Sequence, residues 1–269
     1  MTSTDGEVLQ SGELTVIGRI RSASNATFLC EAVLGERQAH CVYKPVAGEA
    51  PLWDFPDGTL AGREVGAYLV SVALRWNIVP YTIIRDGPAG PGMVQRWVDQ
   101  PGDDIDGEPT AGPDLVDLLP AGRIPPGYLP ILQAYDYAGD EVTLVHADDD
   151  RLRRMAVFDV LVNNADRKGG HILSGVDGGV YGVDHGVTLH AEDKLRTVLW
   201  GWAGKPVDDQ TLESVAALRD DLRDSLADRL CGHITEREIS ALLARTVALL
   251  ADPVMPTPDR HRPIPWPAF

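Results

Sequence analysis

The sequence has few cysteines, no long apolar run and no basic start. Its three cysteines, Cys30, Cys41 and Cys231, are widely spaced and form no metal-ligand pattern. This usage predicts free thiols in a reducing cytoplasm, and we expect a cytoplasmic protein. A transmembrane helix needs about 18 or more consecutive apolar residues, and the absence of such a run predicts no membrane insertion. The opening stretch MTSTDGEVLQ lacks a basic start and an apolar segment, so we expect no secretory signal there.

Basic residues are also scarce. Lysine and arginine number 24 against 40 aspartates and glutamates, which gives a formal net charge of −16. Nucleic acids and anionic membranes bind basic surfaces, so we expect neither as a partner. A pocket with local cations or a metal ion could still hold a nucleotide. The net charge therefore excludes a class of partner but not a class of ligand.

The first half of the chain reads as mostly β. Hydrophobic residues make up 44% of the sequence, enough for a substantial core. Short β-branched and apolar runs with turn residues between them predict an antiparallel meander, then a helix, then two further strands. The predicted strands cover 13–22, 27–35, 39–46, 78–87 and 92–99, and the predicted helix covers 59–76.

The second half reads as mostly helical. A helix is predicted over 148–164, with an acidic start and an apolar second half, followed by short strands at 169–175 and 179–190. Two later amphipathic helices are predicted. One is marked by the spacing of Leu212, Val215, Leu218, Leu222 and Leu226. The other covers 234–250, with Thr235 and Glu238 spaced as a capping box.

These elements predict an α+β fold with two lobes and a cleft between them. We expect a flexible tail over 1–12 and a β-rich N-lobe over 13–98. An acidic linker or insert, rich in glycine and proline, is expected over 99–130. A mostly helical C-lobe over 131–251 and a proline-rich extension over 252–269 complete the prediction.

Two polar clusters interrupt apolar segments at the start of the second half. The first is FDVLVNNADRKGGHIL at 158–173, and the second is YGVDHGVTLH at 181–190. Binding of a metal–nucleoside triphosphate needs a lysine for the phosphates, a carboxylate to orient it, and oxygen ligands for the metal. It also needs a carboxylate beside the acceptor hydroxyl. Lys44 on a strand, Glu64 on a helix, Asp166 in a loop and Asp184 before a glycine supply this set in order.

The order and the local motifs resemble the protein-kinase-like superfamily, in particular its phosphatidylinositol 3-/4-kinase-like branch. That branch has D-R-H-x-x-N in its catalytic loop and D-F-G at its metal-binding aspartate. The chain has DRKGGH at 166–171 and DHG at 184–186. The combination NNADRKGGHIL with YGVDHG looks most similar to a family of actinobacterial proteins assigned to that branch. The resemblance covers residues 14–250 and implies a two-lobed protein-kinase-like fold that binds ATP with Mg²⁺ or Mn²⁺.

The resemblance assigns the nucleotide site to the first half. It implies that Lys44 contacts the α- and β-phosphates and that Glu64 holds Lys44. The segment 22–25 would cover the phosphates. Because no glycine lies between Gly18 and Gly35, this segment would either be stiffer than a glycine-rich loop or use the side chains of Ser22, Ser24 and Asn25. The segment 94–98, which includes Gln95, Trp97 and Val98, would be the hinge beside adenine.

The resemblance assigns the chemistry to the second half. It implies that Asp166 positions the acceptor and that Asp184 binds the metal. Lys168 replaces the usual histidine and could neutralise charge developing on the phosphate. His171 replaces the metal-binding asparagine, so either the metal can be Mn²⁺ or His171 contacts phosphate or water instead. His185 replaces the phenylalanine of D-F-G.

Each residue also has a purely structural interpretation. Lys44 and Glu64 alone would be surface charges, and Asp166 and Asp184 alone would be turn residues. His171 could be only a structural hydrogen-bonder. Asn164 is expected to cap the helix end, whereas Asp159, a carboxylate within an apolar helix, is expected to be paired and to brace the following loop. Trp200 and Trp202, which could stack on a sugar-like ring, are expected to pack in the core.

The function expected from these residues is transfer of the γ-phosphoryl group of ATP to a hydroxyl. The acceptor would be a soluble small molecule, inositol- or sugar-like, or a protein. Two alternatives stay open on the same scaffold. One is adenylyl transfer, and the other is a pseudokinase that binds nucleotide without catalysis.

Overall fold

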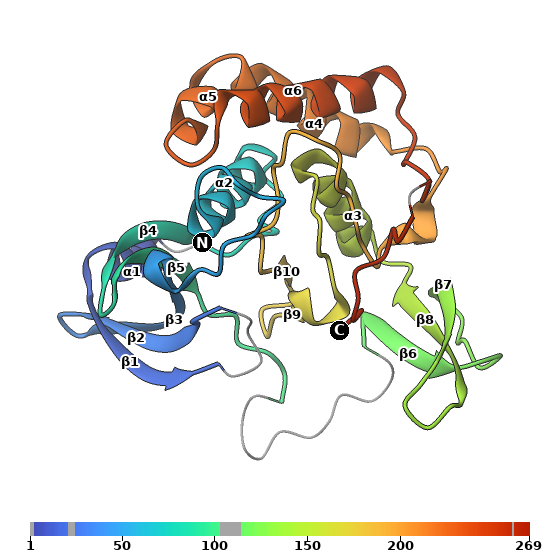
Figure 1. Ribbon diagram of the computed structural model, residues 1–269, viewed down its shortest axis with the longest axis horizontal. Coiled ribbons are helices and arrows are strands. Elements are labelled where there is room, and N and C mark those ends of the chain that lie inside the picture. Colours follow the sequence, from blue (N-terminus) through green and yellow to red (C-terminus); the bar gives the residue numbers. More distant parts are fainter. Residues whose placement is uncertain (1–2, 21–24, 103–113, 260) are drawn as a thin grey trace.

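The protein has a mixed α+β fold, described by a computed structural model for residues 3–20, 25–102, 114–259 and 261–269 (Figure 1). The strands are β1 (Glu13–Arg19), β2 (Phe28–Leu34), β3 (Arg37–Pro45), β4 (Thr82–Gly87), β5 (Gly90–Arg96), β6 (Val116–Pro120), β7 (Tyr128–Tyr135), β8 (Glu141–Ala147), β9 (Ile172–Ser174) and β10 (Val180–Gly182). The helices are α1 (Ser3–Ser11), α2 (Leu60–Ala73), α3 (Asp150–Val162), α4 (Asp209–Leu222), α5 (Ser225–Leu230) and α6 (Glu236–Ala251).

The first five strands form one antiparallel sheet in the order β1-β2-β3-β5-β4. The predicted meander and the two later strands are thereby confirmed. Side chains alternate between the two faces of a strand, and β3 shows this clearly. Cys41 and Tyr43 are fully buried on one face. Val42 and Lys44 lie on the other face, where they line a pocket.

The first face of this sheet is covered by α1, which corrects the expected flexible tail over 1–12. Val8 and Leu9 on α1 are buried and join a cluster with Cys30, Cys41 and Tyr43 of the sheet. Two adjacent apolar residues in a polar segment are too weak a pattern to predict a helix. A helix this short is stabilised by the surface that it packs on, which the local sequence does not reveal.

α2 lies between the five-stranded sheet and the later helices (Figure 1). Its N-cap Thr59 accepts a hydrogen bond from Gly62 N, and the Glu49 carboxylate accepts from the first two backbone N–H groups of the helix. Arg63 is buried and donates to Glu238 of α6 over 2.6 Å. These contacts fix α2 to both halves of the molecule, and Glu64 with it.

Strands β6, β8 and β7 form a three-stranded antiparallel sheet in that order. The prediction of a linker over 99–130 is therefore wrong for its second half, and the residues that follow it begin with strands and not with a helix. β6 lies inside the range expected to be a linker, whereas residues 103–113 lie outside the described residues. The central strand β8 is buried from Val142 to His146. The alternation of apolar and polar residues that would predict a strand is weak in β6 and β7, because both are partly exposed edge strands. β7 also contains Pro130, which argues against a strand when only the sequence is read.

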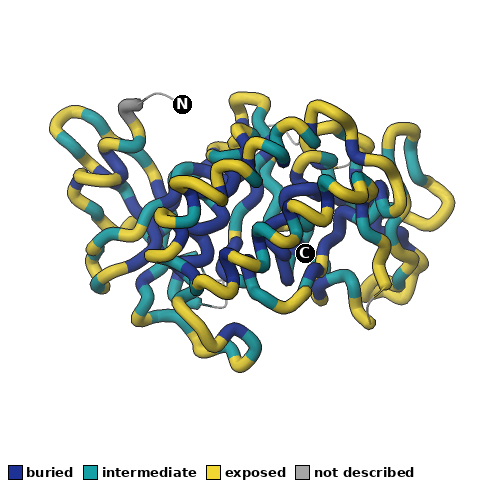
Figure 2. The backbone as a smooth tube through the Cα atoms, turned by 90° about the horizontal axis from the view of Figure 1, so that it is seen from above, coloured by how far each residue is buried: buried dark blue, intermediate teal, exposed yellow. Residues whose placement is uncertain are grey.

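The remaining core lies among α2, α3, α4, α5 and α6. The predicted helices at 59–76, 148–164 and 234–250 are confirmed, whereas the single helix predicted from Leu212 to Leu226 is wrong in extent, because α4 ends at Leu222 and Leu226 lies on α5. The capping box between Thr235 and Glu238 is present at the start of α6. Figure 2 shows that the buried backbone is concentrated in the middle of the molecule, whereas the outer loops are exposed. Within the described ranges, none of the helices combines the length and apolar character that a bilayer span requires.

Candidate active site

Lys44 lies at the centre of a three-residue ion cluster. Its Nζ donates to Glu64 Oε1 over 2.7 Å and to Asp184 Oδ1 over 2.8 Å. The second oxygen of Glu64 accepts from the backbone N–H of His185 over 2.9 Å. Glu64 is almost fully buried, whereas the side chain of Asp184 is 52% exposed. The fold thus brings together Lys44, Glu64 and Asp184, from the sheet, α2 and the loop after β10.

The charges of this cluster stabilise one another. Burial alone would lower the pKa of Lys44, but the carboxylates of Glu64 and Asp184 outweigh it and raise that pKa. The Lys44 ammonium holds the pKa of Asp184 well below its usual range. Asp184 also has a φ of +60°, which places it in the left-handed region. Strained backbone of this kind occurs often at functional sites.

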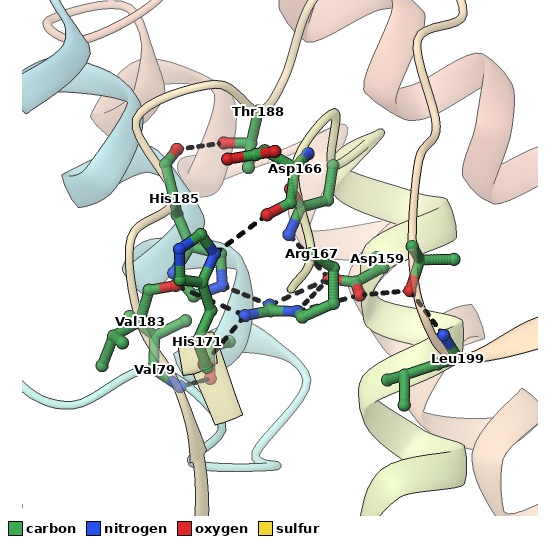
Figure 3. A network of polar contacts seen from close by, with 12 residues as sticks. Val79, Asp159, Asp166, Arg167, His171, Val183, His185, Thr188 and Leu199 are labelled. Atoms are coloured by element: carbon green, nitrogen blue, oxygen red, sulfur yellow. Dashed lines mark hydrogen bonds and ion pairs between the residues drawn. The ribbon is translucent and has the colours of Figure 1, made fainter. Parts of the chain in front are cut away.

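The loop after α3 is braced by a buried ion pair (Figure 3). Arg167 donates to both carboxylate oxygens of Asp159 and contacts Nε2 of His185 at 2.7 Å. Asp159 and Arg167 are both fully buried. The expected bracing role of Asp159 is confirmed. Arg167 was not identified from the sequence as the partner of Asp159. The signal was present, because Asp159 needs a cation if it is buried and Arg167 follows in the next loop, directly after Asp166.

The two asparagines of this loop have roles that correct the expected cap. Asn163, with a φ of +53°, is the left-handed C-cap of α3, and Asn164 is not. Asn164 instead donates to Asp159 Oδ1 and accepts from Asp166 N through its side chain. Asn164 therefore holds the backbone at Asp166.

Asp166 and Lys168 lie next to each other at the mouth of the loop. Lys168 Nζ is 3.5 Å from Asp166 Oδ2. Burial raises the pKa of the Asp166 carboxyl, and the Lys168 ammonium opposes that effect. A carboxylate with a raised pKa accepts a proton more readily, which suits contact with a hydroxyl.

His171 lies between Asp166 and Asp184. Its Nδ1 is 2.9 Å from the backbone carbonyl oxygen of Asp166, and its Nε2 is 3.4 Å from Asp184 Oδ2. Burial lowers the pKa of His171 to about 4. No group of three or more His, Cys, Asp or Glu side chains placed to hold a metal occurs among the residues that the structure describes. His171 and Asp184 are the pair of side chains here that could hold a metal together.

Two pockets meet at Lys44 and Asp184, which line both. The first, about 290 Å³, also contains His171 and the three hinge residues predicted from the sequence: Gln95, Trp97 and Val98. The Gln95 side chain donates a hydrogen bond to the Thr82 hydroxyl, and the backbone N–H of Trp97 donates to the carbonyl oxygen of His40. The backbone N–H of Trp97 is therefore already hydrogen-bonded within the protein, so it does not offer a free donor to a ligand in this pocket.

The second pocket, about 320 Å³, contains Asp166 and Arg196. Asn25 lines it, but the Asn25 side chain accepts from Ala50 N and so holds the neighbouring loop. Ser22 and Ser24 lie outside the described residues. Glu49, which caps α2 at the wall of this pocket, was not identified from the sequence.

The tryptophans and a third cavity lie apart from this cluster. Trp202 is buried beside His146, with ring centroids 4.4 Å apart, and Trp200 Nε1 donates to Pro263 O. For Trp202 these contacts support packing in the core, whereas Trp200 is half-buried and lines the third cavity. A cavity of about 390 Å³ between α3, α6 and the C-terminal segment contains none of the predicted site residues.

We compared the chain with protein families and with curated proteins. No family model matches the chain. The protein Rv2133c of Mycobacterium tuberculosis (strain ATCC 25618 / H37Rv) is 72% identical over 271 residues, which cover 100% of this chain and 98% of the relative. The chain therefore belongs to the same family as the mycobacterial protein Rv2133c.

Proposed function

We propose that the protein is a kinase that transfers the γ-phosphoryl group of ATP to a hydroxyl. The acceptor would be a soluble small molecule, inositol- or sugar-like, or a protein. The observation that carries the proposal is the position of Lys44, whose Nζ joins Glu64 and Asp184 at the junction of two pockets. One of those pockets contains Asp166 and the other contains the predicted hinge.

The proposed fold is the two-lobed protein-kinase-like fold. The five-stranded antiparallel sheet with α2 would be the N-lobe, and α3 to α6 would form most of the C-lobe. This assignment is supported by the order of the parts along the chain: lysine on β3, glutamate on α2, aspartate after α3 and aspartate after β10. The resemblance noted from the sequence predicts the same order.

The two pockets suggest how the substrates lie. The pocket beside Gln95 and Val98 would take the adenosine, and the pocket beside Asp166 would take the acceptor. The phosphates would then lie at Lys44 and Asp184, which both pockets share. Each pocket has about the volume of a site for a small ligand.

The donors present fit a divalent ion. His171 Nε2 and Asp184 Oδ2 lie 3.4 Å apart, and sites for nucleotide-bound metals commonly use few protein ligands plus phosphate oxygens. When bound, the ion would neutralise charge on the phosphates. Lys44 would supply a second positive charge to them, and Lys168, beside Asp166, a third.

In the proposed reaction, the acceptor oxygen forms a bond to the γ-phosphorus as the bond to the β–γ bridging oxygen breaks and ADP leaves. The hydroxyl proton passes to the Asp166 carboxylate. Because Asn164 and the Asp159–Arg167 pair fix the loop, Asp166 is held in place before substrate binds. Catalysis would depend mainly on positioning and on charge neutralisation.

The test is calorimetric titration of ATP, with Mg²⁺ and separately with Mn²⁺, into the wild type and Asp184→Asn. Metal-dependent binding that is at least tenfold weaker in a folded Asp184→Asn variant supports the proposal. Asp221→Asn, on the exposed surface of α4, is the matched control and should bind as the wild type does. No nucleotide binding with either metal would overturn the proposal.

Product analysis then separates the possible reactions. ADP released in the presence of an acceptor supports phosphoryl transfer, whereas pyrophosphate indicates adenylyl transfer instead. Nucleotide binding without either product, across a screen of polyols, sugars and proteins, would favour a pseudokinase.

A further inference from the structure

The orientation of His171 is fixed by its contact with the backbone at Asp166. A carbonyl oxygen can only accept a hydrogen bond, so the ring nitrogen 2.9 Å from Asp166 O, Nδ1, is the one that carries the proton. Nε2 then presents its lone pair to Asp184 Oδ2, which is 3.4 Å away. Two hydrogen-bond acceptors therefore face each other across this gap.

A direct ion pair does not account for this geometry. Charge-assisted hydrogen bonds between nitrogen and carboxylate oxygen measure about 2.7–2.9 Å, well below the 3.4 Å seen here. Two ligands at right angles on a metal with bonds of about 2.1 Å lie about 3.0 Å apart. The separation of Nε2 and Oδ2 is thus close to that of two ligands on one ion.

The surroundings of His171 match those of a metal-ligating histidine. Such a histidine commonly donates its other ring N–H to a backbone carbonyl or a carboxylate, which fixes the tautomer and the direction of the lone pair. The His171 side chain is only 16% exposed, so its ring has little freedom to turn away. The other oxygen of Asp184 is held by Lys44, which leaves Oδ2 facing His171.

We infer that His171 Nε2 and Asp184 Oδ2 bind one divalent ion and that the imidazole makes the site prefer a first-row transition ion to Mg²⁺. The inference rests on the proposed function for its remaining ligands, which would be phosphate oxygens and water. Mg²⁺ strongly prefers an all-oxygen shell, whereas imidazole is a good ligand for transition ions. Substitution of His171 by asparagine replaces this nitrogen with an amide oxygen and should reverse the preference.

Two nearby cations make the site dependent on nucleotide. Lys44 Nζ donates a hydrogen bond to Asp184, and Lys168 lies beside Asp166. The positive charges of both lysines repel a metal ion that binds here without an anionic ligand. Negative phosphates would compensate for that repulsion. We therefore expect tight metal binding only when a nucleotide is present.

The first experiment uses the wild-type protein, Mn²⁺ as the probe and the non-hydrolysable analogue adenylyl-imidodiphosphate. Free Mn²⁺ is measured by electron paramagnetic resonance, and nucleotide binding is measured by calorimetry on the same samples. Electron spin echo spectra of the bound Mn²⁺ should contain a ¹⁴N coupling from a directly bound imidazole. That coupling should change to the ¹⁵N pattern in protein labelled with [¹⁵N]histidine, a readout that needs no variant.

The second experiment compares His171→Asn with the wild type and with His40→Asn, whose histidine is exposed on β3. In His171→Asn the ¹⁴N coupling should disappear, and the Mg²⁺ concentration that displaces half of the Mn²⁺ should fall by at least about tenfold. His40→Asn should match the wild type in both measurements. If His171→Asn does not fold, His171→Gln takes its place.

The outcomes separate this inference from the proposed function. Nucleotide and Mn²⁺ bound without a histidine ¹⁴N coupling would overturn the inference and leave the kinase proposal standing. An unchanged Mg²⁺ displacement in His171→Asn would do the same. Mn²⁺ bound through His171 without any nucleotide binding would support His171 as a ligand, but it would overturn both the kinase proposal and the expected dependence on nucleotide.

Discussion

Arg167 Nη2 lies 2.9 Å from Asp159 Oδ1, and neither side chain is exposed to solvent. The pair joins the buried face of α3 to the loop that carries Asp166. Arg167 also contacts His185, the residue after Asp184. A single arginine thus links α3 to both of the polar segments that contain the candidate catalytic aspartates (Figure 3).

Asp159→Ala should be strongly destabilising because it leaves the Arg167 guanidinium buried without its counter-charge. Loss of one partner of a buried pair costs about 3–5 kcal/mol of the free energy of unfolding. Urea unfolding measures this value, with Asp221→Asn as the surface control. The double variant Asp159→Leu/Arg167→Met, which removes both charges, should recover much of the loss. A loss below about 1 kcal/mol in Asp159→Ala would contradict the bracing role.

The elements that could be predicted from the sequence are those whose periodicity is strong and local. β2 and β3 alternate cleanly, α2 and α6 have apolar faces, and α6 also begins with a capping box. The resemblance carried by the order of Lys44, Glu64, Asp166 and Asp184 implied that these residues share one site. Lys44, Glu64 and Asp166 lie on or after elements whose type was predicted correctly, whereas Asp184 lies in a loop and not within the strand predicted over 179–190.

The parts that could not be predicted depend on contacts between distant segments. α1 forms because Val8 and Leu9 find an apolar sheet face, and neither residue predicts that face. In the three-stranded sheet only β8 has a continuous buried stretch, from Val142 to His146, and the edge strands β6 and β7 are largely exposed or half-buried. The pairing of Arg167 with Asp159 depends on how the loop returns over α3.

Lys44→Met should weaken nucleotide binding or phosphoryl transfer by about a hundredfold or more, the usual cost of removing one preorganised charge from a reacting centre. It should also destabilise the fold, since Glu64 is 1% exposed and would lose its cation. The double variant Lys44→Met/Glu64→Gln should recover stability in urea unfolding but not nucleotide binding by calorimetry. Recovery of binding in the double variant would show that Lys44 acts only as a structural partner of Glu64.

Stability should fall as the pH drops below about 6.5. Burial lowers the pKa of His146, which faces Trp202 and Asp148 and accepts a hydrogen bond from Gly201 N. Below its ordinary value of 6.5, the unfolded chain binds a proton on this histidine that the folded chain excludes. Unfolding in urea at pH 7.5, 6.5 and 5.5 should show a loss of up to about 1.4 kcal/mol per pH unit from this group. The slope should be smaller in His146→Gln and unchanged in His40→Gln.

Native protein should react with iodoacetamide at Cys231 alone among its three cysteines. Cys231 is exposed, whereas Cys30 and Cys41 are fully buried between the five-stranded sheet and α1. Burial also raises the pKa of Cys41 to about 12, so its reactive thiolate is scarce. Mass spectrometry should find one label in the native protein, none in native Cys231→Ser and three in unfolded wild type. Labelling of Cys30 or Cys41 in the native protein would contradict the docking of α1.

Gly169→Ala should impair transfer without weakening nucleotide binding. A Cβ at Gly169 would clash with the ring of Phe269, and Gly169 N donates to Ala268 O over 2.8 Å. The same C-terminal segment accepts hydrogen bonds at Pro263 O from the segment after Asp184, so its displacement would loosen both loops around the site.

Because the reacting groups must be aligned closely, kcat should fall by about tenfold to a hundredfold while the Kd for nucleotide stays within about twofold. Gly170→Ala is the matched control, since a Cβ there meets no atom within 4 Å. Gly169→Ala/Phe269→Ala should restore part of the lost kcat because it removes the clash. If Gly170→Ala were as impaired as Gly169→Ala, the effect would come from the loop backbone itself and not from its contact with the C-terminal segment.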